Sequence, residues 1–245
     1  MPKFFTEKNL INENTLEIKG EEALHISEVL RIKSGEEITV GDGDENDYVC
    51  KTVSVKKSEI LCDIIEKKKN ENEPNVKITL FQALPKGDKM ELVIQKCIEI
   101  GVVEIIPIDT RNSMVKLKGK EEKKIARWNK IALSAAKQCG RGIIPEVKPL
   151  MSFKDAADMA VEKFDGALMP YECERVNSIK TFAKGFKGKS LAIFIGSEGG
   201  FDQSEVNYAL SKGISTVTMG KRILRTETAG LAASVIILYE AGDLS

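Results

Sequence analysis

A single histidine and few cysteines limit the chemistry open to this sequence of 245 residues. The five cysteines are scattered without a C-x-x-C pair, and only His25 could join them as a metal ligand. We therefore expect no metal site and no disulfide framework, and a reducing, cytoplasmic location. A Ser-His-Asp hydrolase is not expected either, because His25 lies far in sequence from every serine in a suggestive turn. His25 is interpreted as a surface or packing residue of a helix.

Long apolar runs and an overall excess of charge are also missing. No stretch reaches the roughly eighteen apolar residues of a membrane span, and the first residues lack the apolar core of a signal peptide. The net charge is zero, yet residues 1–75 contain 11 Lys and Arg against 17 Asp and Glu, whereas residues 76–245 contain 26 against 20. Such asymmetry is typical of nucleic-acid-binding proteins and indicates the second part of the chain.

Residues 1–70 predict a small β-rich domain. One helix is expected over 21–30, and a strong turn signal follows at Gly41–Asp44. Short strands are predicted at 4–5, 15–18, 37–40, 48–53 and 59–65. Short strands with one helix are typical of a small barrel. The polar segment 67–75, which contains Pro74, predicts a linker, so we place the boundary between a domain of residues 1–70 and a domain of residues 76–245.

Residues 76–245 alternate between strand and helix patterns, which predicts an α/β domain with a parallel sheet. We expect Asp88 and Glu91 to form a capping box at the start of the first helix. Strands are predicted at 76–84, 102–108, 166–170, 191–195 and 216–219. Helices are predicted after Asp88, within 111–141, at 153–163, after the glycine-rich turn at 196–200, and at 226–239. The last of these is apolar nearly all round, which indicates burial on every side and a protein interface.

Two loops follow predicted strands near the carboxyl terminus, and ligands of open α/β sheets bind beyond such strand ends. The first, Gly196–Gly200, lacks the ending of a P-loop, and Glu198 would repel a phosphate. A neutral or partly cationic ligand, read by backbone groups, is favoured. The simpler alternative is a tight turn whose glycines only supply positive φ. The second loop, Gly220–Arg225, contains two arginines.

The segment from Arg111 to Arg141 contains ten Lys and Arg but only two acidic residues. At about 100° per residue in a helix, five of these cations fall within an arc of roughly 80°: Lys123, Arg127, Lys130, Lys137 and Arg141. Apolar residues lie on the opposite side. This pattern favours an RNA backbone track. The alternative is an ordinary solvated face.

Four segments together resemble the RsmE family, over nearly the whole chain. They are Pro85–Glu91, Arg127–Arg141, Gly196–Phe201 and Met219–Ala229. The chain differs from the usual family pattern at Ser197, where members usually have proline, and at Lys3, where they tend to have arginine. The resemblance implies an S-adenosyl-L-methionine-dependent methyltransferase of the SPOUT class. It would methylate N3 of a uracil in 16S rRNA, at position 1498.

The same resemblance implies a homodimer, a trefoil knot in the α/β domain, and a PUA-like first domain that helps to hold the rRNA or the small subunit. Two alternatives stay open: another RNA base or a ribose as target, and an RNA-binding module without catalysis. The acidic first domain is the feature that keeps the first of them open, since phosphates are bound mostly by Lys and Arg.

The residues expected at the site follow from these loops and from the resemblance. Methyl transfer to N3 requires loss of the imide proton and stabilisation of the resulting negative charge, which suits the planar cation of Arg225. No convincing general base is evident, and Glu227 is only a candidate. The predicted cofactor-binding residues are Leu168, Met169, Ile195, Gly196, Glu198, Gly199, Gly200, Met219, Gly220, Ile223, Leu224 and Thr228. The predicted RNA-binding residues are Lys3, Arg111, Lys123, Arg127, Lys130 and Arg222.

Overall fold

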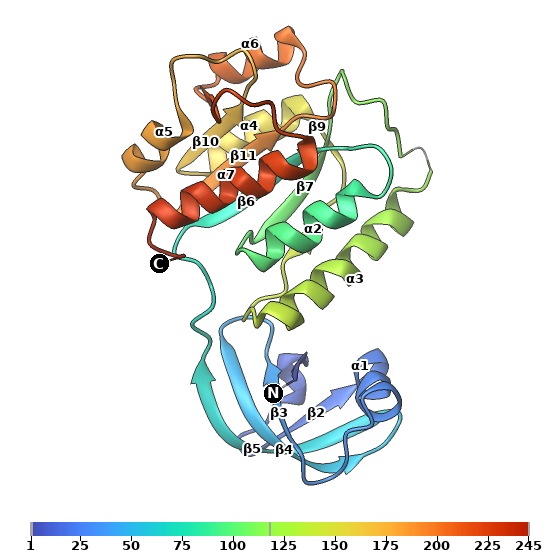
Figure 1. Ribbon diagram of the computed structural model, residues 1–245. Helices are drawn as coiled ribbons and strands as arrows, with labels where there is room; N and C mark the ends of the chain where they lie inside the picture. Colours follow the sequence, from blue (N-terminus) through green and yellow to red (C-terminus); the bar gives the residue numbers. More distant parts are fainter. Residues whose placement is uncertain (1, 118, 245) are drawn as a thin grey trace. The chain divides into compact units, whose positions relative to one another are not determined.

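The computed structural model describes residues 2–117 and 119–244, which divide into two compact units (Figure 1). Unit 1 contains the chain up to Glu73 together with Ala136–Ile144. Unit 2 contains Pro74–Ala135 and the chain from Pro145 onward. Unit 1 is therefore discontinuous in sequence, because the segment 136–144 belongs to it, and no sequence pattern predicted this.

Unit 1 is a curled sheet of five strands in the order β1-β3-β4-β5-β2 (Figure 1). Its elements are β1 (Lys3–Phe5), the 3-10 turn η1 (Lys8–Leu10), β2 (Thr15–Lys19), α1 (Gly20–Leu24), the π-helical turn η2 (His25–Val29), β3 (Glu37–Gly41), β4 (Asn46–Val55) and β5 (Glu59–Lys69). All five predicted strands are present. The predicted helix is interrupted by η2, after which Arg31 adopts a φ of 55°. Alternate strand residues, such as Leu16, Ile18, Ile38 and Val40, fill one apolar core.

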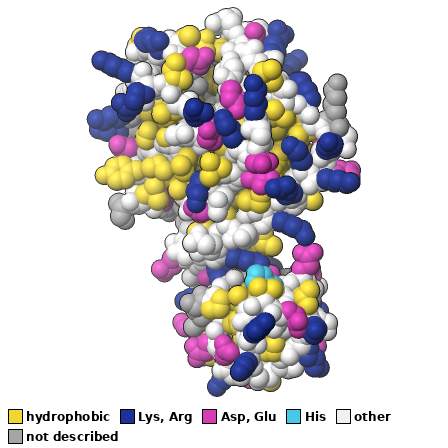
Figure 2. Space-filling model, turned by 45° about the vertical axis from the view of Figure 1, so that its right-hand side comes forward, with side chains coloured by type: hydrophobic (Ala, Val, Ile, Leu, Met, Phe, Trp, Pro, Cys, Tyr) yellow, Lys and Arg dark blue, Asp and Glu magenta, His cyan; other side chains and the backbone are white. Residues whose placement is uncertain are grey.

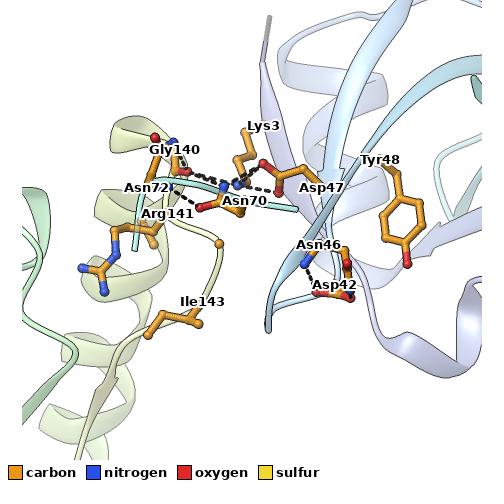
Figure 3. Close-up of polar contacts among 12 residues, drawn as sticks. Lys3, Asp42, Asn46, Asp47, Tyr48, Asn70, Asn72, Gly140, Arg141 and Ile143 are labelled. Carbon is orange, nitrogen blue, oxygen red and sulfur yellow. Dashed lines mark hydrogen bonds and ion pairs between the residues drawn. The ribbon is translucent and has the colours of Figure 1, made fainter. Parts of the chain in front are cut away.

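Lys3 is buried in unit 1, where it joins the amino-terminal strand to the segment 136–144 (Figure 3). Its ammonium group lies 2.7 Å from a carboxylate oxygen of Asp47 and donates to the carbonyl oxygen of Gly140 at 3.2 Å, and the side chain is 6% exposed. Asn70 donates to the same two residues at 2.7 Å and 3.1 Å. The folded unit thus engages the ammonium group of Lys3, and its predicted contact with RNA stays a prediction.

The predicted linker and the predicted cation row are both corrected in this region. Strand β5 extends to Lys69, and Asn70 is buried, so residues 67–70 belong to unit 1 and are not a linker. Arg141, 2% exposed, donates to both carboxylate oxygens of Glu73 at 2.9 Å and 2.7 Å. Burial alone would raise the pKa of Glu73, but the hydrogen bonds and charge of Arg141 outweigh it and hold that pKa below its ordinary value. Arg141 therefore stabilises unit 1.

Unit 2 is built on a fully parallel sheet of seven strands in which the order β12-β10-β11-β6-β7-β8 holds and β9 also pairs with β7. Its elements are β6 (Lys77–Ala83), α2 (Lys89–Glu99), β7 (Glu104–Asp109), α3 (Glu121–Cys139, whose last turn belongs to unit 1), β8 (Glu146–Val147), β9 (Met151–Ser152), α4 (Phe153–Lys163), β10 (Gly166–Pro170), α5 (Ile179–Gly185), β11 (Ser190–Ile195), α6 (Gln203–Ser211), β12 (Ser215–Val217) and α7 (Thr226–Glu240). The predicted parallel α/β sheet is confirmed.

Helices cover both faces of this sheet, which explains its continuous apolar strands. On one face, Phe81 of β6 and Phe194 of β11 stack with ring centroids 4.6 Å apart, in a core completed by α4 and α6 (Figure 1). On the other face, α2 and α7 cover the sheet, and Gly230 lets α7 approach Leu80, since an added Cβ would lie 3.3 Å from its methyl groups (Figure 1).

In unit 2 one local prediction is wrong, one helix was not predicted, and the predicted burial of α7 on every side is incomplete within one chain. Asp88 precedes α2, but its side chain forms no capping hydrogen bond; the capping box lies instead at α6, between Asp202 and Glu205. Helix α5 was not predicted, because its seven residues show too little periodicity to be recognised. Helix α7 is not buried on every side of this chain. Its outer residues Leu231, Ala232, Val235 and Ile236 are half-buried, and Tyr239 is 63% exposed.

The described residues carry five free cysteine thiols. In the same part of the chain, no helix is both long and apolar enough to cross a membrane. Nor do residues 2–117 and 119–244 contain a group of three or more His, Cys, Asp or Glu side chains that could hold a metal ion. His25 is exposed in η2.

Candidate functional site

A cavity of about 860 Å³ opens in unit 2 at the carboxyl ends of β10, β11 and β12. These three strands are neighbours and run parallel, so their following loops emerge at the same edge of the sheet. The two loops singled out in the sequence, 196–200 and 219–225, both line this cavity. The other lining residues are Lys89, Pro170, Tyr171, Glu172, Arg175, Ile195, Phe201, Thr218, Thr226 and Ala229.

The glycines of the first loop permit close backbone approaches that a side chain would prevent. Gly200 adopts a φ of 65°, which favours glycine, and an added Cβ would lie 2.7 Å from the Glu172 carboxylate. A Cβ on Gly196 would lie 3.1 Å from the backbone of Gly200. The same turn forms one wall of the cavity, which favours a ligand-binding loop over the alternative of a turn alone.

Hydrogen bonds from two other elements hold this loop in place. Ser197 donates through Oγ to the carbonyl oxygen of Asn112 at 3.2 Å, and Asn112 returns a bond through Nδ2 to the carbonyl oxygen of Gly199 at 3.0 Å. Thr226 donates to the carbonyl oxygen of Gly196 at 2.6 Å and accepts from the buried amide of Gln82 at 2.9 Å. Sequence reasoning missed Asn112 and Gln82, because nothing in their local pattern indicates the loop that they contact.

Lys89 joins two carboxylates beside the cavity. Its ammonium group lies 3.2 Å from Glu198 and 3.2 Å from Glu227, and the backbone N–H of Lys86 also donates to Glu198 at 3.1 Å. Burial alone would raise the pKa of each carboxyl group, but backbone hydrogen bonds and Lys89 hold both below their ordinary values. The carboxylate of Glu198 is thus engaged within the chain, and ionised Glu227 is a weak base.

Arg222 and Arg225 are exposed on the second loop and line the cavity. Neither guanidinium group forms a hydrogen bond or an ion pair with another residue in the described part of the chain. Ile223 between them is 85% exposed. The charge of Arg225 contributes to the lowered pKa of Glu227. A permanent cation with unused donors at a cavity wall is suited to an oxygen that gains negative charge.

Glu174 fixes the third loop, which follows β10. Its carboxylate accepts from the backbone N–H groups of Arg175, Val176 and Asn177 at 2.9, 2.8 and 3.2 Å, and from the hydroxyl of Thr216 at 2.7 Å. The hydrogen bond from Val176 and the others lower the pKa of Glu174 to about 2. This carboxylate therefore stays ionised and keeps the loop that carries Glu172 and Arg175 in one conformation.

The variant Glu174→Gln is expected to lower the thermal unfolding midpoint at neutral pH by a few degrees, because an amide accepts these N–H bonds less strongly. The pKa of Glu174 is lower in the folded state, so its stabilisation is fully present above the ordinary value of 4.5 and is lost as the pH falls toward 2. Unfolding midpoints measured from pH 7 downward should therefore converge for the two proteins below about pH 4.5. The neighbouring variant Glu172→Gln is the control; a constant gap would contradict the assignment.

Some predicted site residues lie elsewhere. Leu168 and Met169 are fully buried in β10 and do not line the cavity, which begins one residue later at Pro170; their predicted contact with a cofactor stays a prediction. Thr228 of α7 is exposed and does not line the cavity, whereas Ala229 does. The predicted cofactor-binding residues that do line it are Ile195, Gly196, Glu198, Gly199, Gly200, Met219, Gly220, Ile223 and Leu224.

The predicted RNA-binding residues of unit 2 remain exposed. Lys123, Arg127 and Lys130 lie on one side of α3, and the apolar side is buried through Trp128. Arg127 donates to both carboxylate oxygens of Glu91, so its charge is partly compensated. Arg111 precedes Asn112, is 70% exposed, and lies 3.7 Å from Asp202. Acidic side chains are interspersed among the Lys and Arg side chains on the face shown in Figure 2.

Two family models match the sequence. The model described as an RNA methyltransferase domain matches residues 71–238, and the model described as an RNA methyltransferase PUA domain matches residues 18–65. The first match contains every residue that lines the cavity.

Individual relatives extend these matches. Ribosomal RNA small subunit methyltransferase E of Bacillus subtilis is 37% identical over 98% of this chain and 97% of its own length. The protein of the same name from Mesomycoplasma hyopneumoniae is 40% identical over 69% of this chain and 72% of its own. Among solved structures, a Ribosomal RNA small subunit methyltransferase E from Neisseria gonorrhoeae, bound to S-adenosyl methionine, has a TM-score of 0.83. It is 30% identical, and the match covers 96% of this chain and 95% of that one.

Proposed function

The chain belongs to the ribosomal RNA small subunit methyltransferase E family, and from this premise we propose that it transfers a methyl group from S-adenosyl-L-methionine to N3 of a uracil in 16S rRNA. By family resemblance, the target is the uracil at position 1498. The enzyme is an rRNA methyltransferase with an α/β methyltransferase domain and a PUA domain. The observation that carries the proposal is the convergence of three strand-end loops on one cavity beside Arg225.

The cavity suits the cofactor in size and in chemistry. Its volume of about 860 Å³ lies in the usual range of small-molecule sites. Its walls offer backbone groups at Gly196, Gly199 and Gly220, and apolar side chains such as Ile195 and Leu224. When bound, S-adenosyl-L-methionine supplies an electrophilic methyl group on a positively charged sulfur. We propose that the two loops hold it chiefly through these backbone and apolar groups.

Arg225 is proposed as the catalytic residue. Loss of the N3 proton places negative charge on the oxygens of the uracil ring, and a fixed guanidinium group next to them lowers the energy of that state. Ionised Glu227 offsets part of the positive field of Arg225 and, with its lowered pKa, is a poor proton acceptor. The proton is therefore proposed to leave to solvent.

The cationic side of α3 is proposed to contact the RNA backbone, together with Arg111 and Arg222. Charge reversal at Lys123, Arg127 and Lys130 should weaken binding to 16S rRNA about tenfold or more and reduce the dependence of affinity on salt. Lys163→Glu on α4 is the control, because it is exposed on a different helix. Filter binding at several salt concentrations measures both quantities. Unchanged affinity in the triple variant would leave this side as ordinary surface.

A homodimer is proposed from the half-buried apolar residues on the outer side of α7 and from Leu92 on the adjacent α2, which is 47% exposed. Light scattering should then give about twice the chain mass of 27.0 kDa, and Val235→Glu should give monomers. A mass equal to one chain for the unmodified protein would refute the dimer. We also propose the trefoil knot typical of the class, a site without metal, and a cytoplasmic location beside the ribosome.

The decisive experiment uses small ribosomal subunits from cells that lack this protein. The purified chain and S-adenosyl-L-methionine with a labelled methyl group are added, and nuclease fragments of the 16S rRNA are examined by mass spectrometry. The expected product is one 3-methyluracil at position 1498. A methyl group on another base or a ribose would refute the proposed target, and cofactor binding without transfer would refute the enzymatic proposal.

A further inference from the structure

Unit 1 contains a hollow of about 540 Å³ that the proposed mechanism does not use. It lies between η2 with its following loop and the end of β4 with the turn to β5. The residues that line it are Ser27, Glu28, Arg31, Ile32, Lys33, Ser34, Val53, Ser54, Val55, Lys56 and Lys57. We call it the basic hollow.

The charge of the basic hollow is opposite to that of the surrounding sequence. Residues 1–75 contain six more acidic than basic residues, yet this hollow gathers four cations, Arg31, Lys33, Lys56 and Lys57, all exposed. Its one carboxylate, Glu28, lies 3.2 Å from Lys57. The nearby Glu36 accepts from the backbone N–H of Lys33 at 2.8 Å, and its negative charge remains close to the hollow. The lining residues nevertheless contain four cations against one carboxylate, and Arg31, Lys33 and Lys56 form no ion pair within the described part of the chain.

The wall that carries Arg31 and Lys33 is fixed in place. The hydroxyl of Thr52 donates to the carbonyl oxygens of Lys33 and Glu36 at 2.7 Å and 3.1 Å, and Ser34 donates to that of Val53 at 2.7 Å. Arg31 adopts a φ of 55°, unusual for a residue with a side chain, two residues after the end of the π-helical turn η2. Strained residues and π-helical turns are frequent at functional sites. The cations are thus held on a preorganised wall.

Exposed apolar residues accompany these cations. Val29 is 69% exposed, Leu30 45% and Val53 44%. On the face of unit 1 visible in Figure 2, hydrophobic side chains lie beside Lys and Arg side chains. A free inorganic anion would gain nothing from apolar neighbours, whereas a nucleic-acid strand presents phosphates together with the apolar faces of riboses and bases. The mixture favours RNA over a small anion.

We propose that the basic hollow binds the phosphodiester backbone of the RNA substrate. The proposal deepens the function stated above and rests on it for the identity of the RNA. It explains how an acidic domain can contact RNA: on this local surface the cations outnumber the carboxylates. Lys3, the cation that the sequence suggested for this task, is buried instead.

The test compares two charge-matched double variants of the full chain. Lys33→Gln with Lys56→Gln removes two charges from the basic hollow, and Lys67→Gln with Lys68→Gln removes two charges from the opposite end of the β4–β5 hairpin, where Lys68 pairs with Asp47. The probe is a 16S rRNA fragment that contains position 1498, titrated by fluorescence anisotropy at several salt concentrations. The first variant should lose at least about tenfold in affinity and about 2 in the log–log salt slope. The second should bind within about threefold of the unmodified chain.

The variant Arg31→Gly keeps the assignment testable if the double variant is unstable. Glycine relaxes the positive φ while removing the cation, so RNA affinity should fall although thermal stability does not. Equal affinity for the two double variants, or unchanged affinity of Arg31→Gly, would overturn the proposal. Methyl transfer is measured separately. If the chain binds RNA through the basic hollow but does not methylate uracil, the proposed function is refuted and the proposed RNA-binding site is not.

Discussion

Arg225→Ala is expected to reduce the rate constant of methyl transfer by about 100- to 1000-fold, the usual effect of removing one group that stabilises a developing anion. The guanidinium group lines the cavity and has no hydrogen-bonded partner among the described residues, so its removal leaves the backbone of both loops intact. The dissociation constant of S-adenosyl-L-methionine should change by less than about threefold. Single-turnover kinetics and calorimetry measure the two quantities.

Arg222→Ala is the matched control, because it removes the same group from the same loop. It should weaken RNA binding while leaving the rate at saturating RNA nearly unchanged. Arg225→Lys should recover only part of the activity, because lysine keeps the charge but not the planar pair of donors. Normal turnover by Arg225→Ala would overturn the catalytic assignment.

Gly196→Val is expected to weaken cofactor binding at least about 100-fold. An added Cβ would lie 3.1 Å from the carbonyl carbon of Gly200 and 3.4 Å from the ring of Phe201, and a branched side chain needs more room still. The backbone of the loop must shift, which would also disturb the hydrogen bond from Thr226 to the Gly196 carbonyl oxygen. Isothermal titration with S-adenosyl-L-methionine measures the loss.

Gly185→Val is the control for this substitution. Gly185 ends α5, and an added Cβ would meet no heavy atom within 4 Å. Cofactor affinity should therefore stay within about twofold. If Gly196→Val bound the cofactor as tightly as Gly185→Val did, the loop 196–200 would not be the cofactor-binding element.

The positions of most helices and strands could be predicted from the sequence, because they depend on local periodicity. The apolar run at 191–195 and the helix at 153–163 lie where they were predicted, with strand β11 beginning one residue earlier. The cap at Asp88 failed for a local reason, since its φ of −94° and ψ of 11° differ from the extended conformation of most N-caps. The presence of Asp with Glu three positions later in the sequence does not reveal these backbone angles.

The hydrogen-bond and ion-pair partners of individual side chains could not be predicted in the same way. Lys3 and Asp47 are 44 residues apart, and Arg141 and Glu73 are 68 apart, so sequence spacing could not show that these cations are engaged within unit 1. Asn112 reaches the glycine loop across 87 residues. Lys3 and Arg141 were interpreted by residue type as exposed cations, whereas their burial depends on segments far away in sequence.

The sequence by itself determined the parallel α/β domain, the β-rich first domain, the two loops beside the site and the family. Each of these is indicated by local features of the sequence: periodicity, turn residues and contiguous motifs. The tertiary structure decided which of the many cations are available. It buried Lys3 and Arg141, paired Arg127 and Lys89, and left Arg225 and the basic hollow exposed. The reason is physical: an opposite charge that folding brings close to a cation competes with an external ligand for it.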